Sequence, residues 1–291
     1  AVRTVDLRLG RLSTAVRVET LGVSARHQVA FVDSPAHFDR AGIYGTKAGE
    51  FSDNAERFAV LCMAALEYGE HATGGPVDIV HAHDWQAGLA PSLLALLPQR
   101  WPQMARAARV TTIHNLAYQG TFDQRIVPRL GLPWRVFTIG GGEFWGQFSF
   151  LKAGINYADL VTTVSPAYAR ETLGLEHGCG FEGVLGGRAD RYLGILNGID
   201  TSVWDPRTDP HLAAPFSAED LRGKRENKRA VLAKLGLPVG DDALERPLIG
   251  MISRLVGQKG IDLVRAASES LSGLDASWGF LGSGEASYEE V

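Results

Sequence analysis

Two patterns of apolar and polar residues divide the chain. Over the first 35 residues the two kinds alternate in three runs, RTVDLRL, TAVRVETL and HQVAFVDS, with turn-like breaks between them. A period of two places the apolar side chains on one face of a strand. This region therefore predicts three extended strands.

From residue 77 onward short, nearly continuous apolar runs alternate with helical stretches. A continuous apolar run suits a strand that is buried on both faces, as in a parallel sheet. The runs are VDIVHAHD (77–84), RVTTIHN (109–115), ADLVTTVS (158–165), YLGILNG (192–198), PLIGMISR (247–254) and SWGFLGS (277–283). The expected helices are 55–68, 86–97, 147–158, 218–235 and 260–271. This alternation predicts an α/β fold with right-handed crossovers.

A domain boundary is expected between about residues 193 and 240. This stretch holds NGID, then WDPRTDP with two prolines, a charged helix and LPVGDD, before a new strand begins at Pro247. We therefore divide the chain into a first domain, 1–193, and a second segment, 194–291, which holds the hinge and the beginning of another domain.

Composition narrows the class of protein. Hydrophobic residues make up 45% and charged residues 21%, which is typical of a soluble globular chain. A net charge of -4 argues against a general affinity for nucleic acid or an anionic membrane, and no apolar run reaches the roughly 18 residues of a membrane span. Two cysteines, Cys62 and Cys179, cannot form a disulfide framework, so a reducing, cytoplasmic location is expected. The sequence carries no signal for an oligomeric state.

Polar residues follow the predicted strands, and this is where the chemistry is expected. Ligands of open α/β sheets bind outside the carboxyl ends of the strands. The endings are His81-Ala-His83-Asp84-Trp85, His114-Asn115, Thr163-Val-Ser165, Asn197-Gly-Ile-Asp200, Ser253-Arg254 and Gly282-Ser-Gly284. Any one ending alone is also typical of turns and helix caps.

Two of these features suggest a metal or a cofactor, and neither fits well. His81 and His83 would share one face of a strand, as a pair of metal ligands can, but Gln86 stands where a further histidine would be needed. A structural or substrate-contacting role is favoured, and we expect no bound metal. The G-x-G-x-x-G at 178–183 follows a helical pattern rather than a strand, so no dinucleotide cofactor is expected.

Arg254 and Lys259 are the best candidates for binding phosphate. They lie in SRLVGQKG, between a predicted strand and the start of a predicted helix, where an anion is stabilised. Because the chain has no Asp-x-Asp pair to hold a metal–diphosphate, a diphosphate would have to be neutralised by these cations. The alternative interpretation is two solvated surface cations.

Several long motifs resemble one enzyme family. HAHDWQAGLAP, TTIHNLAYQGTF, FSFLKAGINYADLVTTVSPAYARE, ILNGIDTSVWDP and ISRLVGQKGIDLV resemble bacterial glycogen synthases, in the ADP-glucose-dependent starch/glycogen synthase family. FDRAGIYG and FSDNAERFAVL fit its earlier region, so the resemblance runs from about Phe31 to Glu285.

The resemblance implies a GT-B glycosyltransferase with two Rossmann-like domains facing each other across a cleft. Most of the first domain, on the acceptor side, and the start of the second, which binds the nucleotide sugar, would be present. Such enzymes move glucose from ADP-glucose to the non-reducing end of an α-1,4-glucan such as glycogen, with retention of configuration and without a metal or other cofactor.

The resemblance also assigns roles to individual residues. His114 matches the active-site histidine that contacts the donor glucose, and Arg254 and Lys259 match the pair that stabilises the departing diphosphate. Residues expected near the donor or acceptor sugars are Tyr44, Asp84, Trp85, Asn115 and Asn197.

Two parts of the family pattern are missing. The Lys-x-Gly-Gly-Leu loop and the later motif with a conserved glutamate are both absent. We therefore interpret the chain as a fragment, expect it to be inactive alone, and expect the segment after about Gly240 to be loosely held. Alternatives are a plant-type starch synthase, a UDP-glucose-using relative, a non-catalytic glucan-binding protein and, from a different class, a metal-dependent hydrolase built on His81 and His83.

Overall fold

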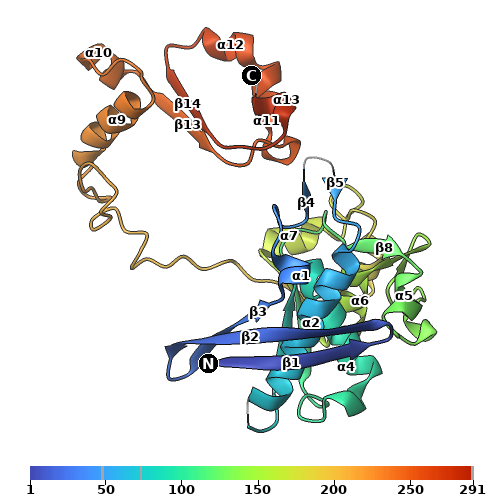
Figure 1. The fold of residues 1–291 in the computed structure, drawn as a ribbon. Coiled ribbons are helices and arrows are strands. Elements are labelled where there is room, and N and C mark those ends of the chain that lie inside the picture. The colour runs from blue at the N-terminus through green and yellow to red at the C-terminus, as the bar shows by residue number, and fades with distance from the viewer. Residues whose placement is uncertain (47–48, 73, 290–291) are drawn as a thin grey trace. The chain divides into compact units, whose positions relative to one another are not determined.

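The computed structural model describes residues 1–46, 49–72 and 74–289, and the chain forms two compact units. The first unit is Ala1–Asn197 and the second is Gly198–Val291 (Figure 1). The sequence placed the division after residue 193, whereas the first unit includes the residues up to Asn197.

The first unit begins with the three predicted strands. β1 (Val2–Leu9), β2 (Leu12–Ser24) and β3 (His27–Asp33) form an antiparallel sheet in that order. Val5, Leu7 and Leu9 are buried, while the residues between them are exposed. The alternation seen in the sequence therefore separates a core-facing side of the sheet from a solvent-facing side.

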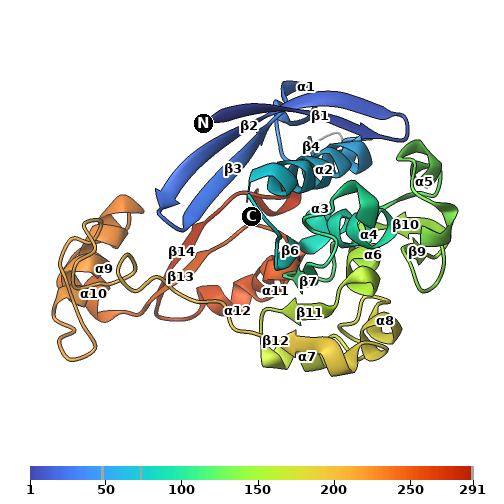
Figure 2. The same cartoon turned by 90° about the horizontal axis from the view of Figure 1, so that it is seen from below.

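The buried side of this sheet packs on a long helix. α2 (Asn54–Ala72) lies along β1 and β2 in Figure 2. Its buried side chains include Phe58, Met63 and Leu66, which join the apolar residues of β1 and β2 in one core cluster. The packing of α2 fixes the start of the helix and so helps to position the preceding loop, which contains Tyr44.

A parallel sheet forms the centre of the first unit, as the continuous apolar runs predicted. Its strands lie side by side in chain order (Figure 2), and the α/β prediction is therefore confirmed. The strands are β6 (Ile79–His83), β7 (Ala108–Ile113), β11 (Leu160–Thr163) and β12 (Tyr192–Gly194). Because all four run in one direction, the residues after β6 and β7 reach the same edge of the sheet.

β6 differs from the prediction of strands buried on both faces. Ile79, His81 and His83 are all exposed, whereas Ala82 between the last two is buried. β6 is the last strand in the sheet order, and its alternate residues point to opposite faces. The two histidines therefore stand on an accessible face.

Helices between the parallel strands cover the sheet. α3 (Asp84–Ala87) and α4 (Leu89–Leu96) follow β6, and α6 (Phe150–Tyr157) packs on both of them. A Cβ added to Gly154 of α6 would lie 2.9 Å from Cα of Gly88, so the backbones can approach this closely only without side chains there.

The helix predicted at 147–158 begins later than expected. Its first residues form β10 (Gln147–Ser149), which pairs with β8 (Thr121–Asp123) and β9 (Glu143–Phe144). Ser149 then caps α6, because its side chain accepts a hydrogen bond from the backbone N–H of Lys152. Pairing with a strand far away in the chain decided the conformation of these residues.

Shorter elements complete the first unit. They are α1 (Pro35–Phe38), β4 (Gly45–Thr46), β5 (Gly49–Glu50), η1 (Pro98–Arg100), α5 (Ile126–Arg129), η2 (Trp134–Val136), α7 (Pro166–Glu171), α8 (Glu182–Gly186) and η3 (Ala189–Arg191). In the described ranges of both units, no helix has the length and apolar character that crossing a membrane requires.

The second unit has a small parallel sheet of two strands. β13 (Leu248–Ile252) pairs with β14 (Ser277–Leu281), as the sequence predicted. Its other elements are α9 (Gly223–Lys234), α10 (Asp241–Glu245), η4 (Gly257–Lys259), α11 (Ile261–Ala266), α12 (Ser268–Ser272) and α13 (Ala286–Glu289). The helix expected from residue 218 begins only at Gly223, and the one expected at 260–271 is divided at Ala267.

The strands of the second unit are only partly covered, as expected from the sequence. Ile249, Ile252 and Phe280 are exposed, and Leu248 and Met251 are half-buried. By contrast, Ile113 and Val161 in the parallel sheet of the first unit are fully buried.

Candidate functional site

The carboxyl ends of β6 and β7 bring Asp84 and His114 together. Asp84 begins α3 with a φ of 55°, a left-handed conformation that few residues other than glycine adopt. Its carboxylate Oδ1 accepts a hydrogen bond of 2.7 Å from the backbone N–H of His114. A strained residue whose side chain fixes a neighbouring strand end is a feature often found at functional sites.

Whereas Asp84 binds the backbone of His114, a residue of β6, His83, contacts its imidazole. Nδ1 of His83 and Nε2 of His114 are 3.0 Å apart and share a hydrogen bond. The His81 and His83 rings lie 4.2 Å apart between centroids, and Nε2 of His81 is hydrogen-bonded to the Thr112 hydroxyl at 2.6 Å. Three imidazoles therefore form a row along this face of the sheet.

The two β6 histidines are exposed as whole residues, yet protein atoms shield their rings from part of the solvent and lower their pKa values. Burial lowers the pKa of His81, and the charge of His114 lowers it further. The pKa of His83 is lowered first by burial and then by its two histidine neighbours, against a smaller opposing effect of Asp84. Both rings are therefore neutral near pH 7.

Trp85, which follows Asp84 in the chain, forms an aromatic wall with Tyr44. Trp85 is buried and packs edge-to-face on Phe58, with 4.5 Å between ring centroids. The half-exposed Tyr44 ring lies 5.8 Å from that of Trp85, and its hydroxyl accepts a hydrogen bond of 2.7 Å from Gln86. The half-exposed Tyr44 ring suits contact with the apolar face of a sugar, whereas the buried Trp85, predicted to lie near the sugars, supports this ring from the core.

Gly120 allows this wall to form. Its φ is 55°, and a Cβ there would lie 2.5 Å from Cε3 of Trp85. Any larger residue would displace the indole, so the glycine in the His114 motif is required by the packing of Trp85.

A buried arginine fixes the loop that carries Tyr44. Arg57 in α2 is 2% exposed and donates to the carbonyls of His37 (2.6 Å) and Ile43 (2.9 Å), and to the side chain of Asn54 (2.6 Å). Asn54 in turn donates to the carbonyl of Tyr44 at 2.8 Å. Burial lowers the pKa of Arg57. The hydrogen bonds to its carbonyl and amide acceptors offset the cost of removing the charged guanidinium from water.

The remaining predicted residues of the first unit are Asn115 and Asn197. The Asn115 side chain accepts a hydrogen bond of 3.0 Å from the backbone N–H of Ala117, which shapes the turn after His114. Asn197 is exposed, lies beyond β12 and is the last residue of the first unit.

Arg254 and Lys259 lie in the second unit, on either side of a tight loop. Both are exposed, and neither forms an ion pair with any described residue. The backbone N–H of Val256 donates to the carbonyl of Arg254, and that of Lys259 donates to the carbonyl of Val256. The helix after them, α11, is shorter than predicted, so the two side chains carry the case for an anion more than the helix does.

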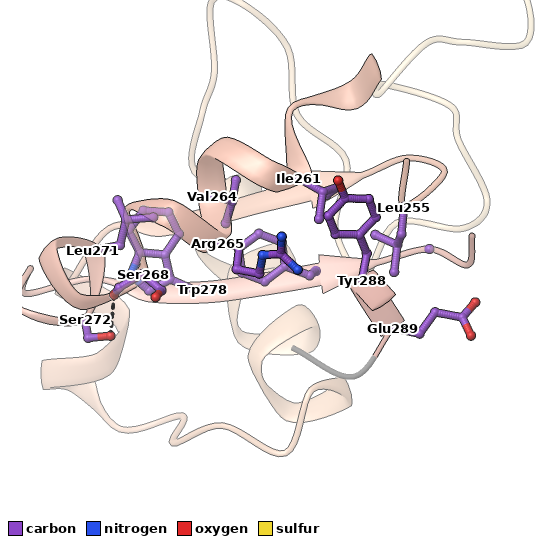
Figure 3. A pocket seen from close by; sticks show the side chains of 12 residues that line it. Leu255, Ile261, Val264, Arg265, Ser268, Leu271, Ser272, Trp278, Tyr288 and Glu289 are labelled. Atoms are coloured by element: carbon purple, nitrogen blue, oxygen red, sulfur yellow. Dashed lines mark hydrogen bonds between the residues drawn. The ribbon is translucent and has the colours of Figure 1, made fainter. Parts of the chain in front are cut away.

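A cavity of about 460 Å³ also lies in the second unit, away from the predicted residues. Figure 3 shows it between α11, α12 and the face of β14, with Arg265 stacked on the Tyr288 ring at 5.2 Å. The indole N–H of Trp278 in its wall is buried and has no hydrogen-bond partner among the described residues. Neither Arg254 nor Lys259 lines this cavity.

The histidine row does not have the geometry of a metal site. Within residues 1–46, 49–72 and 74–289, no group of three or more His, Cys, Asp or Glu side chains could hold a metal ion. His81 directs Nε2 to a threonine and His83 directs Nδ1 to another imidazole. The structure therefore gives the H-x-H pair hydrogen-bonding roles.

Reasoning from the sequence missed several supporting residues. The Tyr168 hydroxyl accepts a hydrogen bond of 3.1 Å from the N–H of Leu116, and Gln119 donates to the carbonyl of Cys179 at 2.8 Å. Thr112 and Arg57 were also not singled out. Of the residues that support His114, the sequence had singled out His83, because its spacing from His81 places both on one face of β6.

Comparison with known proteins gives a consistent answer. Residues 2–187 match the starch synthase catalytic domain family. The chain is 46% identical to a glycogen synthase of Koribacter versatilis over 91% of this chain and 53% of that protein. It is 49% identical to a glycogen synthase of Anaeromyxobacter dehalogenans over 90% of this chain and 54% of that protein.

A solved structure shows the same fold. The catalytic domain of starch synthase IV from Arabidopsis thaliana, bound to ADP and acarbose, is similar with a TM-score of 0.84 and 32% identity. The match covers 99% of this chain and 58% of that one, and it confirms the predicted GT-B class. The chain thus spans somewhat more than half the length of these relatives.

Proposed function

The chain belongs to the starch synthase catalytic domain family, and from that premise we propose that it serves a glycogen synthase reaction. In this reaction, glucose passes from ADP-glucose to the non-reducing end of an α-1,4-glucan. One observation carries the proposal: the histidine of the His114 motif stands at the end of β7, fixed by Asp84 and His83 beside an aromatic wall. The relatives named glycogen synthase support the same activity.

The first unit supplies the groups for the sugars. His114 contacts the donor glucose, and its fixed backbone favours one ring position, so binding energy is not lost in ordering it. Tyr44 offers an accessible aromatic face near the sugars, and the buried Trp85 supports it by packing against its ring. Asn115 and Asn197 complete the proposed sugar-contacting set, the former through the turn that it stabilises after His114.

The second unit supplies the charge for the leaving group. As the bond between the anomeric carbon and the diphosphate oxygen breaks, negative charge grows on that oxygen. The exposed cations Arg254 and Lys259 stabilise it electrostatically. The acceptor 4-hydroxyl forms the new bond to the same carbon and its proton leaves with ADP. This scheme assigns no step to a metal.

The proposal is tested in the complete gene product that contains this chain. Transfer of radiolabelled glucose to glycogen is measured from ADP-glucose and from UDP-glucose, with and without EDTA. We expect turnover with ADP-glucose, little with UDP-glucose and no loss with EDTA. Turnover only with UDP-glucose would show that the proposed donor is wrong. Binding of glucan without turnover would contradict the proposal that the protein is an enzyme. Activity that EDTA abolishes and one divalent ion restores would contradict the metal-free scheme.

Variants connect the activity to the proposed residues. Arg254→Ala or Lys259→Ala should each lower turnover about 10²–10³-fold, since a stabilising group for developing charge contributes roughly 3 kcal/mol. Lys234→Ala, an exposed cation of α9, is the matched control and should leave turnover unchanged. His114→Ala should lower kcat more than it raises KM. Rates of Arg254→Ala and Lys259→Ala within threefold of the parent would contradict the assignment.

A further inference from the structure

His81 and His83 form a sequence motif whose role the proposed function leaves open. The motif was considered as a metal pair, yet the described residues offer no third ligand. What the structure shows is a contact between imidazoles from neighbouring strands, His83 of β6 and His114 beyond β7. The question is what such a contact does to His114.

An N···N hydrogen bond between two neutral imidazoles has only two forms. Either His83 donates from Nδ1, which leaves the proton of His114 on its own Nδ1, or His114 donates from Nε2 to a bare Nδ1 of His83. In the second form both rings carry their proton on Nε2, the commoner tautomer of neutral histidine. The 3.0 Å separation fits either form, and we favour the second because it leaves both rings in the commoner tautomer.

We propose that His83 is a positioning residue for His114: its Nδ1 accepts the Nε2–H of His114 and so keeps Nδ1 of His114 unprotonated, as an acceptor for a substrate hydroxyl. In the described part of the chain, Nδ1 of His114 makes no hydrogen bond, and the residue is exposed. The substrate named here rests on the proposed function, whereas the tautomer is a property of this chain alone.

Two further contacts give His83 the rigidity that this role needs. Its ring packs against that of His81, with 4.2 Å between centroids and a tilt of 31° between the ring planes. His81 is itself fixed through Thr112, whose hydroxyl is 2.6 Å from that of Thr162 on the next strand. Thr112 and Thr162 are buried, so the row of rings is anchored in the sheet interior.

Asp84 and His83 fix different parts of His114, its backbone and its side chain. Asp84 fixes the His114 backbone N–H, and His83 fixes its ring, so removal of His83 should leave the strand end in place. The histidine ring would then rotate freely about its side-chain torsions. A misplacement of this kind can cost up to about 100-fold in rate without unfolding the protein.

The first experiment needs no activity. Residues 1–291 are labelled with ¹⁵N-histidine, and two-bond ¹H–¹⁵N correlations report the tautomer of each ring. We expect His114 as the Nε2–H form in the parent, with a scalar coupling across the hydrogen bond to Nδ1 of His83. In His83→Ala the coupling disappears and His114 becomes a mixture of tautomers. A His114 signal of the Nδ1–H form, or one unchanged in His83→Ala, would overturn the proposal.

The second experiment measures turnover in the complete gene product. His83→Ala should lower kcat about 10–100-fold with little change in KM. His83→Asn should recover most of it, because the amide oxygen can lie near the former Nδ1 and accept from Nε2–H. His83→Gln places its amide farther out, near the former Nε2, and should not recover it. His27→Ala, an exposed histidine of β3, is the control.

The two experiments separate the two proposals. If the parent shows no glucosyl transfer, the proposed function fails, and the tautomer in the isolated chain still decides the role of His83. If the parent is active but His83→Asn is as impaired as His83→Ala, the positioning role is wrong. Equal rates for the parent and His83→Ala would lead to the same conclusion.

Discussion

The two units of this chain use similar elements but bury them to very different extents. In the first unit, one cluster joins α2, the antiparallel sheet and the parallel sheet, and includes fully buried Trp101, Phe148 and Phe150. Among the described residues of the second unit, only three apolar side chains are buried: Leu232, Leu244 and Ile261. A two-stranded sheet offers too little surface to build a large core.

The difference also separates the two kinds of proposed chemistry. The histidine row and the aromatic wall stand on elements anchored in the large core. Arg254 and Lys259 stand on a loop whose surroundings are mostly exposed. Precise ring positions need a rigid support, whereas two long cations can adapt to an anion. Each of the following predictions compares the units directly.

The largest expected effect is in hydrogen exchange. Amides of β7 and β11 should exchange only through global unfolding of the first unit, whereas those of β13 and β14 should exchange through local opening. We expect protection to differ by at least about 1000-fold, since folded domains have stabilities of about 5–15 kcal/mol. Residue-resolved exchange measured by NMR checks this. Comparable protection of the two sheets would show that the second unit is as firmly folded as the first.

Removing one phenylalanine from each unit should have unequal effects. Phe150 is fully buried, with its ring 4.9 Å from that of Phe122, so Phe150→Ala should reduce the free energy of unfolding of the first unit by about 3–5 kcal/mol. Phe280 is 46% exposed, and Phe280→Ala should cost about 1 kcal/mol or less. Urea unfolding followed by circular dichroism measures both. A larger loss for Phe280→Ala would contradict the comparison.

An arginine from each unit gives a smaller contrast. Arg57→Met removes the buried guanidinium that donates to the carbonyls of His37 and Ile43, and it should cost about 2–3 kcal/mol while loosening the loop of Tyr44. Arg225 in the second unit pairs with Asp241 at 3.0 Å but is 43% exposed. Arg225→Met should therefore cost less than about 1 kcal/mol. The unfolding midpoints of the two variants measure these two costs, and Tyr44 fluorescence serves as a local probe of the loop.

The smallest expected effect is on the loss of folding stability at acidic pH. The hydrogen-bonded Arg109 lowers the pKa of Asp159 in the first unit, so the carboxylate stabilises the fold above the unfolded pKa near 3.9. That contribution is lost as pH falls through the lower, folded pKa. Since Asp159 is 44% exposed, its share is less than about 1 kcal/mol after solvent screening.

Asp159→Asn should therefore narrow the difference in stability between pH 7 and pH 3. Asp220 of the second unit, whose pKa Arg222 lowers at the surface, provides the matched variant Asp220→Asn, which should narrow that difference less. Urea midpoints at the two pH values measure the effect. If the two substitutions changed the pH dependence of stability equally, the partly buried carboxylate of Asp159 would contribute no more than the surface carboxylate of Asp220.

The sequence by itself determined the elements whose patterns are local. Alternation along 1–35 predicted the β1–β2–β3 sheet, and the apolar runs predicted both parallel sheets. The motifs around His114 and Arg254 predicted the family that the comparisons confirm. These signals survive because side-chain periodicity and motif chemistry are properties of neighbouring residues. The roles of the individual site residues remain predictions.

Only the tertiary structure decided what distant residues do to one another. Gln147–Ser149 became a strand because β8 and β9 offered hydrogen bonds, although the local pattern favoured a helix. His83 meets His114 because parallel pairing of β6 with β7 brings together residues 31 positions apart in the chain. Arg57 supports Tyr44 through acceptors on a loop. Hydrogen bonds of this kind depend on the relative placement of whole elements, which no local pattern encodes.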